Sequence, residues 1–404
     1  MSRVCVVGGG TAGLEAAREA ERCGAAVTLI ERSGVPDPPW KAWPDLISLR
    51  QPQSAMPPVP GRGFAGTLIR GDARSAGRGF VTTSDGTRLR FDSVVAATGC
   101  GFEPTPVAGL QKVGVHLLDR AREYTELGLG AESASNVIVY GEGARGLQVA
   151  DRLCRGRGVR VVISHWEQGE PSWNIRGAIF KAAGERGVAI CYGALSRALG
   201  VGPLEAVVVD GKVVPCDLLA LLPKRLPRVI PMPAQTGRKG GLSVDRYLMT
   251  STEGTFAAGG CAEFSSLQGF PSTLENEPGM SGRVAGANAA GRHLAFEGAS
   301  PREFRLFGLR WTAAGAGLAH LLDSYPVEVV SETLEGSACA IAVERSTGRV
   351  LGIETVESED SEPADLSSVA SGLASLRSLA YCGSSDISLV SETARLGLRT
   401  WQSS

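Results

Sequence analysis

The sequence lacks several features that would place it in other classes of protein. No apolar run approaches the roughly 20 residues that a membrane-spanning helix needs. The 404 residues carry 41 basic and 42 acidic side chains, so no excess of one sign favours nucleic acid or an anionic membrane. Disorder is excluded by an apolar content of 43%. We expect a cytoplasmic protein of two or three domains, with no membrane span and no nucleic-acid partner.

Cysteine is present, but not at the spacing of a metal site or of a redox pair. The nine cysteines are scattered along the chain, and no two of them stand in Cys-x-x-Cys order. Neither a zinc site nor a close redox pair is therefore encoded locally. The four histidines form no cluster. We expect no metal site, and we assign no proton-transfer residue.

A glycine motif stands near the start of the chain. Residues 3–7 have the pattern of a buried strand, residues 14–23 that of an alanine-rich helix, and residues 26–30 that of a second strand. The run Gly8-Gly9-Gly10-Thr11-Ala12-Gly13 joins the first strand to the helix, and Glu31 follows the second strand. Such glycines let the backbone approach a pyrophosphate, the helix N-terminus attracts it, and the acid accepts from ribose hydroxyls. The motif predicts dinucleotide binding.

A second copy of this pattern spans residues 136–163. Its motif is Gly141-Glu142-Gly143-Ala144-Arg145-Gly146. Ser164 stands where the first copy has Glu31, and His165 follows, so no carboxylate is available for the 2′-hydroxyl of NAD. The site either tolerates the 2′-phosphate of NADP or has lost its nucleotide. Two such units suggest a flavin and a nicotinamide held in one protein.

With these motifs the sequence resembles the FAD-dependent pyridine nucleotide-disulfide oxidoreductase superfamily. It is most similar to the branch of NADH oxidases, coenzyme A-disulfide reductases and ferredoxin reductases. Further likeness lies in four segments, at residues 91–109 (with Ala97-Thr98-Gly99), 242–263, 281–291 and 341–353. The resemblance implies an α/β fold with two Rossmann-like βαβ domains, the FAD domain being interrupted by the NAD(P)-type domain, and a C-terminal α+β interface domain.

The resemblance also implies domain limits and a function. The FAD-binding domain would comprise residues 1–110 and 240–300, the NAD(P)-binding-like domain residues 111–239, and the C-terminal dimerisation domain residues 302–404. A turn-rich seam at residues 237–241 supports one of these limits. The implied activity passes hydride from NAD(P)H to FAD, and electrons on to an unidentified acceptor such as O₂, a quinone or a small iron–sulfur protein. A homodimer is expected.

Site residues follow from the same resemblance. For FAD they are Gly8, Gly10, Thr11, Ala12, Gly13, Glu31, Arg32, Lys41, Thr98, Gly99, Gly259 and Gly260. For NAD(P) they are Gly141, Gly143, Ala144, Gly146, Ser164 and His165. Lys41 and Gln148 are the catalytic candidates: a cation near the flavin would stabilise negative charge on it, and Gln148 would face the nicotinamide.

Three departures from the family pattern bear on the chemistry. Residues 36–47 contain no cysteine, whereas disulfide reductases need a thiolate there to attack the substrate sulfur. Gln148 replaces a common Glu and cannot take a proton. Gly260 replaces an Asp that accepts a hydrogen bond from the flavin's ribityl chain. Glu263 could partly substitute for that Asp, but we expect it to be a surface residue. Cys100 is either a redox-active thiol or a packing residue.

Two functions remain open on the sequence. The first is an FAD-dependent NAD(P)H oxidoreductase that is not a typical disulfide reductase, because direct hydride transfer needs positioning rather than a side-chain base. The second is a diverged, non-enzymatic or partner-dependent subunit that keeps a nucleotide for structure or regulation. The replacements at Ser164, Gln148 and Gly260 favour the second, whereas the intact first motif favours the first.

Overall fold

The chain is a mixed α/β protein that divides into two compact units. The computed structural model describes residues 1–32, 43–49, 65–104, 106–119, 121–154, 158–166, 170–265, 271–274, 277–296, 302–315, 326–334, 337–346 and 350–361. Unit 1 comprises residues 1–134, 196–208 and 217–300. Unit 2 comprises residues 135–195, 209–216 and the chain from residue 301 onward.

A parallel five-stranded sheet is the centre of unit 1. Its strands, in the order β19-β7-β1-β2-β3, are Thr255–Ala257, Ser93–Ala96, Arg3–Val7, Ala26–Glu31 and Thr67–Arg70. The inner strands are almost continuously apolar and buried, as expected for a parallel sheet covered by other elements. The sequence patterns at residues 3–7 and 26–30 therefore predicted two of these strands.

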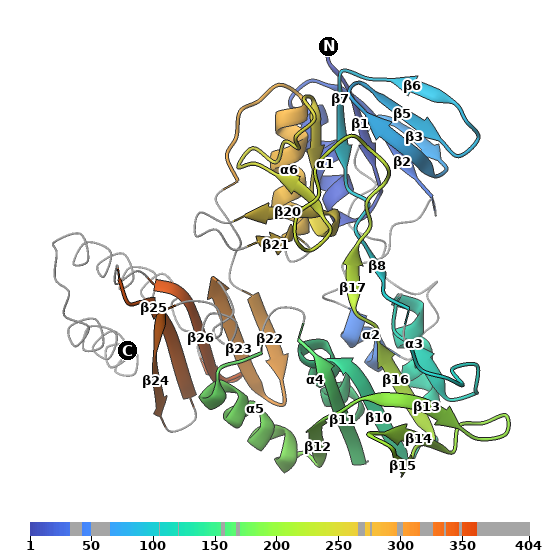
Figure 1. Ribbon diagram of the computed structural model, residues 1–404, viewed down its shortest axis with the longest axis vertical. Coiled ribbons are helices and arrows are strands. Elements are labelled where there is room, and N and C mark those ends of the chain that lie inside the picture. Colours follow the sequence, from blue (N-terminus) through green and yellow to red (C-terminus); the bar gives the residue numbers. More distant parts are fainter. Residues whose placement is uncertain are drawn as a thin grey trace. The chain divides into compact units, whose positions relative to one another are not determined.

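Two helices, α1 (Thr11–Arg22) and α6 (Pro278–Ala289), pack against each other beside this sheet (Figure 1). Small residues allow the two backbones to approach closely. A Cβ atom at Gly282 would lie 2.3 Å from the carbonyl oxygen of Ala12, and one at Gly286 would lie 2.1 Å from that of Ala16. The C-terminal part of unit 1 is thereby attached to the first glycine motif.

The remaining elements of unit 1 are short. One small sheet contains β4 (Ala73–Gly77), β5 (Phe80–Thr83) and β6 (Arg88–Arg90), and a second contains β8 (Cys100–Phe102) and β17 (Arg225–Pro227). A third contains β18 (Leu242–Val244), β20 (Ala262–Ser265) and β21 (Pro271–Thr273). Strands β9 (Val115–Leu117) and β16 (Leu218–Leu222) pair in parallel. The others are α2 (Trp43–Leu49), α3 (Ala121–Gly130), β13 (Leu195–Leu199), β14 (Ala206–Val209) and the 3₁₀ turn Gly259–Cys261.

Unit 2 joins a second βαβ module to an antiparallel sheet. The module contains the parallel strands β10 (Asn136–Glu142), β11 (Gly158–His165) and β12 (Val188–Tyr192), with helices α4 (Gly143–Leu153) and α5 (Trp173–Glu185). The antiparallel sheet has the order β22-β23-β26-β25-β24, which are Arg302–Leu306, Leu309–Gly315, Val350–Ser358, Ser337–Glu344 and Val327–Leu334. The short strand β15 (Lys212–Pro215) also lies in unit 2, outside this sheet.

Helix α5 packs against this antiparallel sheet (Figure 1). Buried polar contacts connect the two. The backbone N–H of Ser172 donates to Glu354 over 2.8 Å, and the side-chain amide of Asn174 donates to the carbonyl of Cys339 over 3.1 Å. Glu354 is only 2% exposed, so its charge is buried against the helix start. Buried polar groups that are satisfied in this way define one register between helix and sheet.

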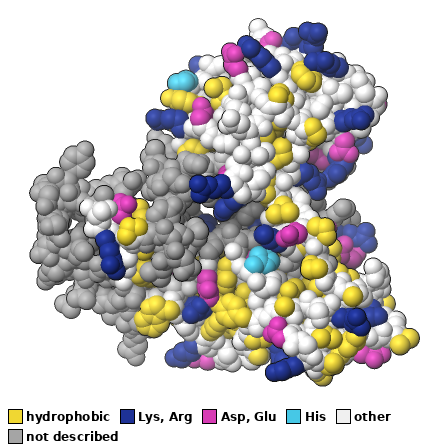
Figure 2. Space-filling model, in the orientation of Figure 1, with side chains coloured by type: hydrophobic (Ala, Val, Ile, Leu, Met, Phe, Trp, Pro, Cys, Tyr) yellow, Lys and Arg dark blue, Asp and Glu magenta, His cyan; other side chains and the backbone are white. Residues whose placement is uncertain are grey.

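The α/β fold with Rossmann-like modules and a C-terminal antiparallel sheet is confirmed. The three predicted domain limits stay a prediction, and so does the homodimer. Lys41 and the chain beyond residue 361 lie outside the described residues. Among the described helices none is long and apolar enough to cross a membrane. Basic and acidic side chains are both distributed over the described part of the face drawn in Figure 2.

Candidate functional site

The first glycine motif forms a turn in which two positions require glycine. Gly8 follows β1 with φ at +105°, and a Cβ there would lie 2.3 Å from the carbonyl oxygen of Ala97. A Cβ at Gly13 would lie 1.8 Å from the carbonyl oxygen of Gly8. The start of α1 therefore rests directly on the end of β1, which is the role of the third glycine in a dinucleotide motif.

The N-terminus of α1 lies beside this turn. Gly10 is the N-cap residue, and no side chain of the described residues caps the helix. Apart from its two chain neighbours, no described residue has an atom within 4 Å of the position of a Cβ at Gly10. Thr11, Ala12 and Gly13 then supply the backbone N–H groups of the first helical turn. An anion can approach this end, where the helix dipole and the N–H groups favour negative charge.

Glu31 lies beside the same turn, at the end of β2. Its Oε2 atom accepts a hydrogen bond of 2.5 Å from the backbone N–H of Gly9. The carboxylate is therefore held next to the glycines, where an acceptor for ribose hydroxyls is expected. Arg32 is exposed, and its Nε atom lies 3.6 Å from Asp72 in a solvent-accessible ion pair.

Two more segments named from the sequence reach the motif. Ala97 contacts Gly8 as described, and a Cβ at Gly259 would lie 2.8 Å from the Cβ of Ala12. Thr98 donates through Oγ1 to the carbonyl of Arg228, and the N–H of Arg228 donates to the carbonyl of Gly99 over 2.9 Å. The structure thus brings the predicted FAD residues of three distant segments together, although their contact with FAD stays a prediction.

Ser281 holds the Gly259–Gly260 turn, and the sequence reasoning missed this role. The Ser281 hydroxyl is fully buried and donates to the carbonyl of Glu277 over 2.6 Å. The same oxygen accepts from the N–H of Gly259 over 3.1 Å. A lone serine in a helix carries no local signal for this contact, because its partner is 22 residues away.

The prediction for Glu263 is wrong. The residue is 3% exposed, and its carboxylate accepts from the N–H groups of Lys239 over 2.8 Å and Gly241 over 3.3 Å. The carboxylate is buried because the turn-rich loop folds over it and supplies the donors that a buried acceptor needs. Glu263 therefore organises the loop between the segments of unit 1.

Two cysteines lie close to this turn in different environments. Cys261 is fully buried, and burial raises the pKa of its thiol, which is the environment of a packing residue. Cys100 is half-buried, and its Sγ atom lies 3.6 Å from the carbonyl oxygen of Gly260. Cys100 is therefore adjacent to the position where the family pattern has an Asp.

The second glycine motif differs from the first, because a side chain of the chain itself caps its helix. Glu142 is the N-cap residue of α4. Its two carboxylate oxygens accept from the N–H of Ala144 over 3.1 Å and from the N–H of Arg145 over 2.7 Å. Sequence reasoning missed Glu142 as a functional residue. The signal was available in the opposite charges at two of the three variable positions of this motif, 142 and 145.

An aromatic ring covers the second glycine of this motif. A Cβ at Gly143 would lie 2.5 Å from the ring of Trp166. Gly141, Ala144 and Gly146 are buried, so most of the predicted NAD(P) residues are enclosed. The glycine at position 143 is required here by the chain's own tryptophan, which occupies the space next to the turn.

The other predicted NAD(P) residues are at the end of β11. Ser164 is exposed, and its hydroxyl lies 2.8 Å from Nδ1 of His165. The register between β10 and β11 shifts there, because Gly141 pairs with Ile163 and Glu142 pairs with His165. Gln148 lies half-buried in α4. The roles of these residues stay predictions.

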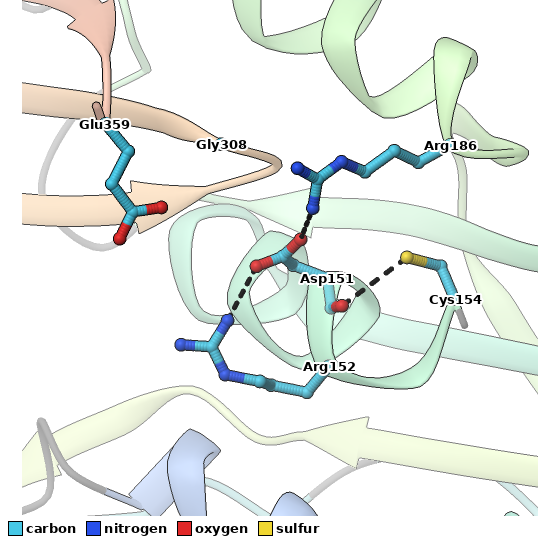
Figure 3. Close-up of a pocket in the computed structure, with 6 residues that line it drawn as sticks. All are labelled: Asp151, Arg152, Cys154, Arg186, Gly308 and Glu359. Carbon is cyan, nitrogen blue, oxygen red and sulfur yellow. Dashed lines mark hydrogen bonds and ion pairs between the residues drawn. The ribbon is translucent and has the colours of Figure 1, made fainter. Parts of the chain in front are cut away.

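Unit 2 also contains a polar cavity of about 510 Å³ (Figure 3). Its lining residues are Asp151, Arg152, Cys154, Arg186, Gly308 and Glu359. Asp151 is buried and accepts from Nη1 of Arg152 over 2.6 Å and from Nη1 of Arg186 over 3.1 Å. Both arginines are paired with Asp151, and Glu359 is a second carboxylate in the lining, so the two basic and two acidic side chains balance in formal charge.

The chain was compared with known proteins. Over 194 residues it is 29% identical to rhodocoxin reductase of Rhodococcus erythropolis, a match that covers 46% of this chain and 45% of that protein. The chain therefore spans less than half the length of this curated relative.

Solved structures share the fold at lower identity. An NAD-dependent persulfide reductase from A. fulgidus is 20% identical, with a TM-score of 0.77 over 98% of this chain and 77% of that one. A ferredoxin reductase from Rhodopseudomonas palustris is 22% identical, with a TM-score of 0.74 over 88% and 91% of the two chains. A water-forming NADH oxidase from Lactobacillus brevis is 19% identical, with a TM-score of 0.75 over 88% and 87%.

The profile of one family covers most of the sequence. The model of the pyridine nucleotide-disulphide oxidoreductase family matches residues 2–293, a span that includes both glycine motifs. The sequence, the fold and this match agree. The chain belongs to the pyridine nucleotide-disulphide oxidoreductase family, whose cofactors are FAD and NAD(P)H.

Proposed function

We propose that this protein is an FAD-dependent oxidoreductase that takes electrons from NAD(P)H and passes them to a small redox protein of the ferredoxin type. The observation that carries the proposal is the first glycine motif, in which an uncapped helix N-terminus and the Glu31 carboxylate flank one turn. This combination suits the pyrophosphate and the ribose of a dinucleotide.

The residues of unit 1 fit FAD. No described residue fills the space beside Gly10, and Gly8 and Gly13 bring the first turn of α1 close to that space. The Gly259–Gly260 turn, held by Ser281, lies against α1 at Ala12. Bound FAD would supply a centre that accepts two electrons together and releases them singly. The chain itself binds the cofactor and orients it.

The acceptor is inferred from what the chain lacks and from its relatives. Residues 36–47 contain no cysteine, so no thiolate follows Glu31 to attack a disulfide. The curated relative is named a rhodocoxin reductase, and one structural relative is a complex of putidaredoxin reductase with putidaredoxin. In such a reaction one NAD(P)H becomes NAD(P)⁺ with release of one proton, and two acceptor molecules take one electron each.

Lys41 and Gln148 keep the roles predicted for them within this proposal. A lysine near the flavin would stabilise negative charge that develops during reduction. A neutral amide at position 148 can donate and accept hydrogen bonds to orient the nicotinamide, but it does not exchange protons. The protein therefore contributes positioning and electrostatics, and it needs no side-chain base.

The test is an absorption spectrum of the purified protein, repeated without oxygen after addition of NADH and then of NADPH. We expect a flavin band that is bleached by one of the two nucleotides. The reduced protein is then mixed in turn with a ferredoxin-type protein, O₂, a quinone and a disulfide. Fastest reoxidation by the ferredoxin-type protein supports the proposal, and fastest reoxidation by any of the others contradicts it.

A second candidate is a subunit that holds FAD without turning over NAD(P)H. The observation that favours it is the second motif, where Glu142 and Trp166 occupy the space around the turn. A flavin band that neither NADH nor NADPH bleaches, even at high nucleotide concentration, would support this candidate.

A further inference from the structure

The start of α4 already holds an anion, and that anion is part of the chain. Both carboxylate oxygens of Glu142 accept hydrogen bonds from the first turn of the helix, at Ala144 and Arg145. In a dinucleotide site these N–H groups are the ones that meet the pyrophosphate. A carboxylate at a helix N-terminus uses the same donors and the same dipole.

Burial makes this arrangement self-sufficient. Glu142 is 3% exposed and Arg145 is 4% exposed, and Nε of Arg145 lies 3.6 Å from Oε2 of Glu142. The carboxylate thus has a buried cation and two N–H donors as partners. A buried charge with such partners is compensated within the protein and needs no bound ligand.

The backbone of the turn in the second motif also differs from that in the first. In the first motif the N-cap of α1 is Gly10, the second glycine. In the second motif the N-cap of α4 is Glu142, one position earlier, and β10 continues through Gly141 to Glu142. The turn is therefore shorter, and the ring of Trp166 packs on the face of Gly143.

We propose that Glu142 acts as an internal substitute for the pyrophosphate of NAD(P)H, and that it determines how tightly the second motif binds this nucleotide. The inference rests on the proposed function in that NAD(P)H is the donor. The pyrophosphate and the carboxylate compete for the N–H groups of Ala144 and Arg145, so the nucleotide binds only when the Glu142 side chain leaves them. NAD(P)H is consequently bound weakly.

The test measures binding by calorimetry, with ligands that cannot reduce the flavin. The full chain, loaded with FAD so that the first motif is filled, is titrated with NAD⁺, NADP⁺ and ADP-ribose, and separately with adenosine, which has no pyrophosphate. The variants are Glu142→Gln, which removes the charge at nearly constant shape, and Glu142→Gly, which copies Gly9 of the first motif. The matched control is Glu185→Gln, which removes an exposed carboxylate from α5.

We expect both Glu142 variants to bind the pyrophosphate-containing ligands at least about tenfold more tightly than the unchanged protein and Glu185→Gln. The affinity for adenosine should be the same in all four proteins. Thermal unfolding verifies that each variant is folded, and Glu142→Gln decides the result if Glu142→Gly does not fold.

Equal or weaker binding by a folded Glu142 variant overturns the inference, and so does an absence of binding in all four proteins. The proposed function fails separately. If the variants bind NAD⁺ or NADP⁺ more tightly but neither NADH nor NADPH bleaches the flavin in any of them, the inference stands and the proposed electron donor is wrong. If the unchanged protein is bleached and Glu142→Gln binds no better, the donor is right and the inference is wrong.

Discussion

The two glycine motifs of this chain have the same spacing and different sites. In the first, no side chain of the described residues caps the N-terminus of α1, and the acid that contacts the turn comes from the end of the next strand. In the second, α4 begins with a carboxylate from inside the motif. The comparison shows that glycine spacing alone does not determine the start of the helix, because the residues between the glycines decide which residue caps it and which group meets its first N–H groups.

The position of the acid explains the difference. Glu31 contacts the first motif from β2, through the N–H of Gly9, and leaves the N–H groups at the start of α1 to a ligand. Glu142 stands where the first motif has Gly9, and it takes the N–H groups of Ala144 and Arg145 for itself. A glutamate at the end of the following strand can therefore support a nucleotide site, whereas a glutamate between the first two glycines of the motif fills it.

The largest expected effect comes from disturbing the close contact between β1 and α1 in the first motif. We expect Gly13→Ala to lower the free energy of unfolding by more than about 2 kcal/mol, because the new Cβ would overlap the carbonyl oxygen of Gly8. FAD content should fall with it. Gly10→Ala is the control, since its Cβ meets no atom within 4 Å, and its stability should stay within about 0.5 kcal/mol of the unchanged protein. Urea unfolding and flavin absorbance measure both effects, and a Gly13→Ala protein of normal stability would refute this account of the turn.

A direct exchange between the motifs tests the role of the internal carboxylate. Gly9→Glu places a glutamate at the position that Glu142 has in the second motif, next to the carboxylate of Glu31. We expect its FAD affinity to fall by about 100-fold, because two carboxylates and the pyrophosphate would repel one another. Gly9→Gln has nearly the same bulk without the charge and should lose less. Equal FAD affinity in the two variants, measured by equilibrium dialysis, would show that bulk alone closes the motif.

The smallest expected effect concerns the cap of α4 without nucleotide. We expect Glu142→Ala to lower the free energy of unfolding by about 1–2 kcal/mol, because two N–H groups lose their acceptor and Arg145 loses a buried partner. Glu142→Gln, which keeps an acceptor, should lose less. Urea unfolding of FAD-loaded protein measures both changes. A Glu142→Ala protein as stable as the original would mean that the cap contributes nothing to the fold.

Local pattern predicted much of the fold correctly. The buried strands at residues 3–7 and 26–30, the helix between them and their repetition around residue 140 follow from apolar periodicity and from glycines at fixed offsets. The acid at position 31 was predicted for the same reason, because it directly ends a strand whose direction is known. These features depend on neighbours within about 30 residues.

The prediction for Glu263 failed because the partners of that residue are distant in sequence. A glutamate after a short strand has the local pattern of a surface residue, and its burial comes from the loop at residues 237–241 folding over it. The buried Ser281 is comparable, because its role depends on the N–H of Gly259. No local sequence pattern predicts which buried polar side chain forms hydrogen bonds with which distant loop.

By itself the sequence determined the two βαβ modules, the family and the glycines that its turns require, because backbone sterics and apolar periodicity act between near neighbours. The tertiary structure decided that side chains of the protein fill the second turn. Trp166 reaches Gly143 across 23 positions of the chain, and the carboxylate of Glu142 is buried with Arg145 only because the module folds around them. Whether side chains of the protein fill a nucleotide motif depends on tertiary packing, which the spacing of the glycines does not determine.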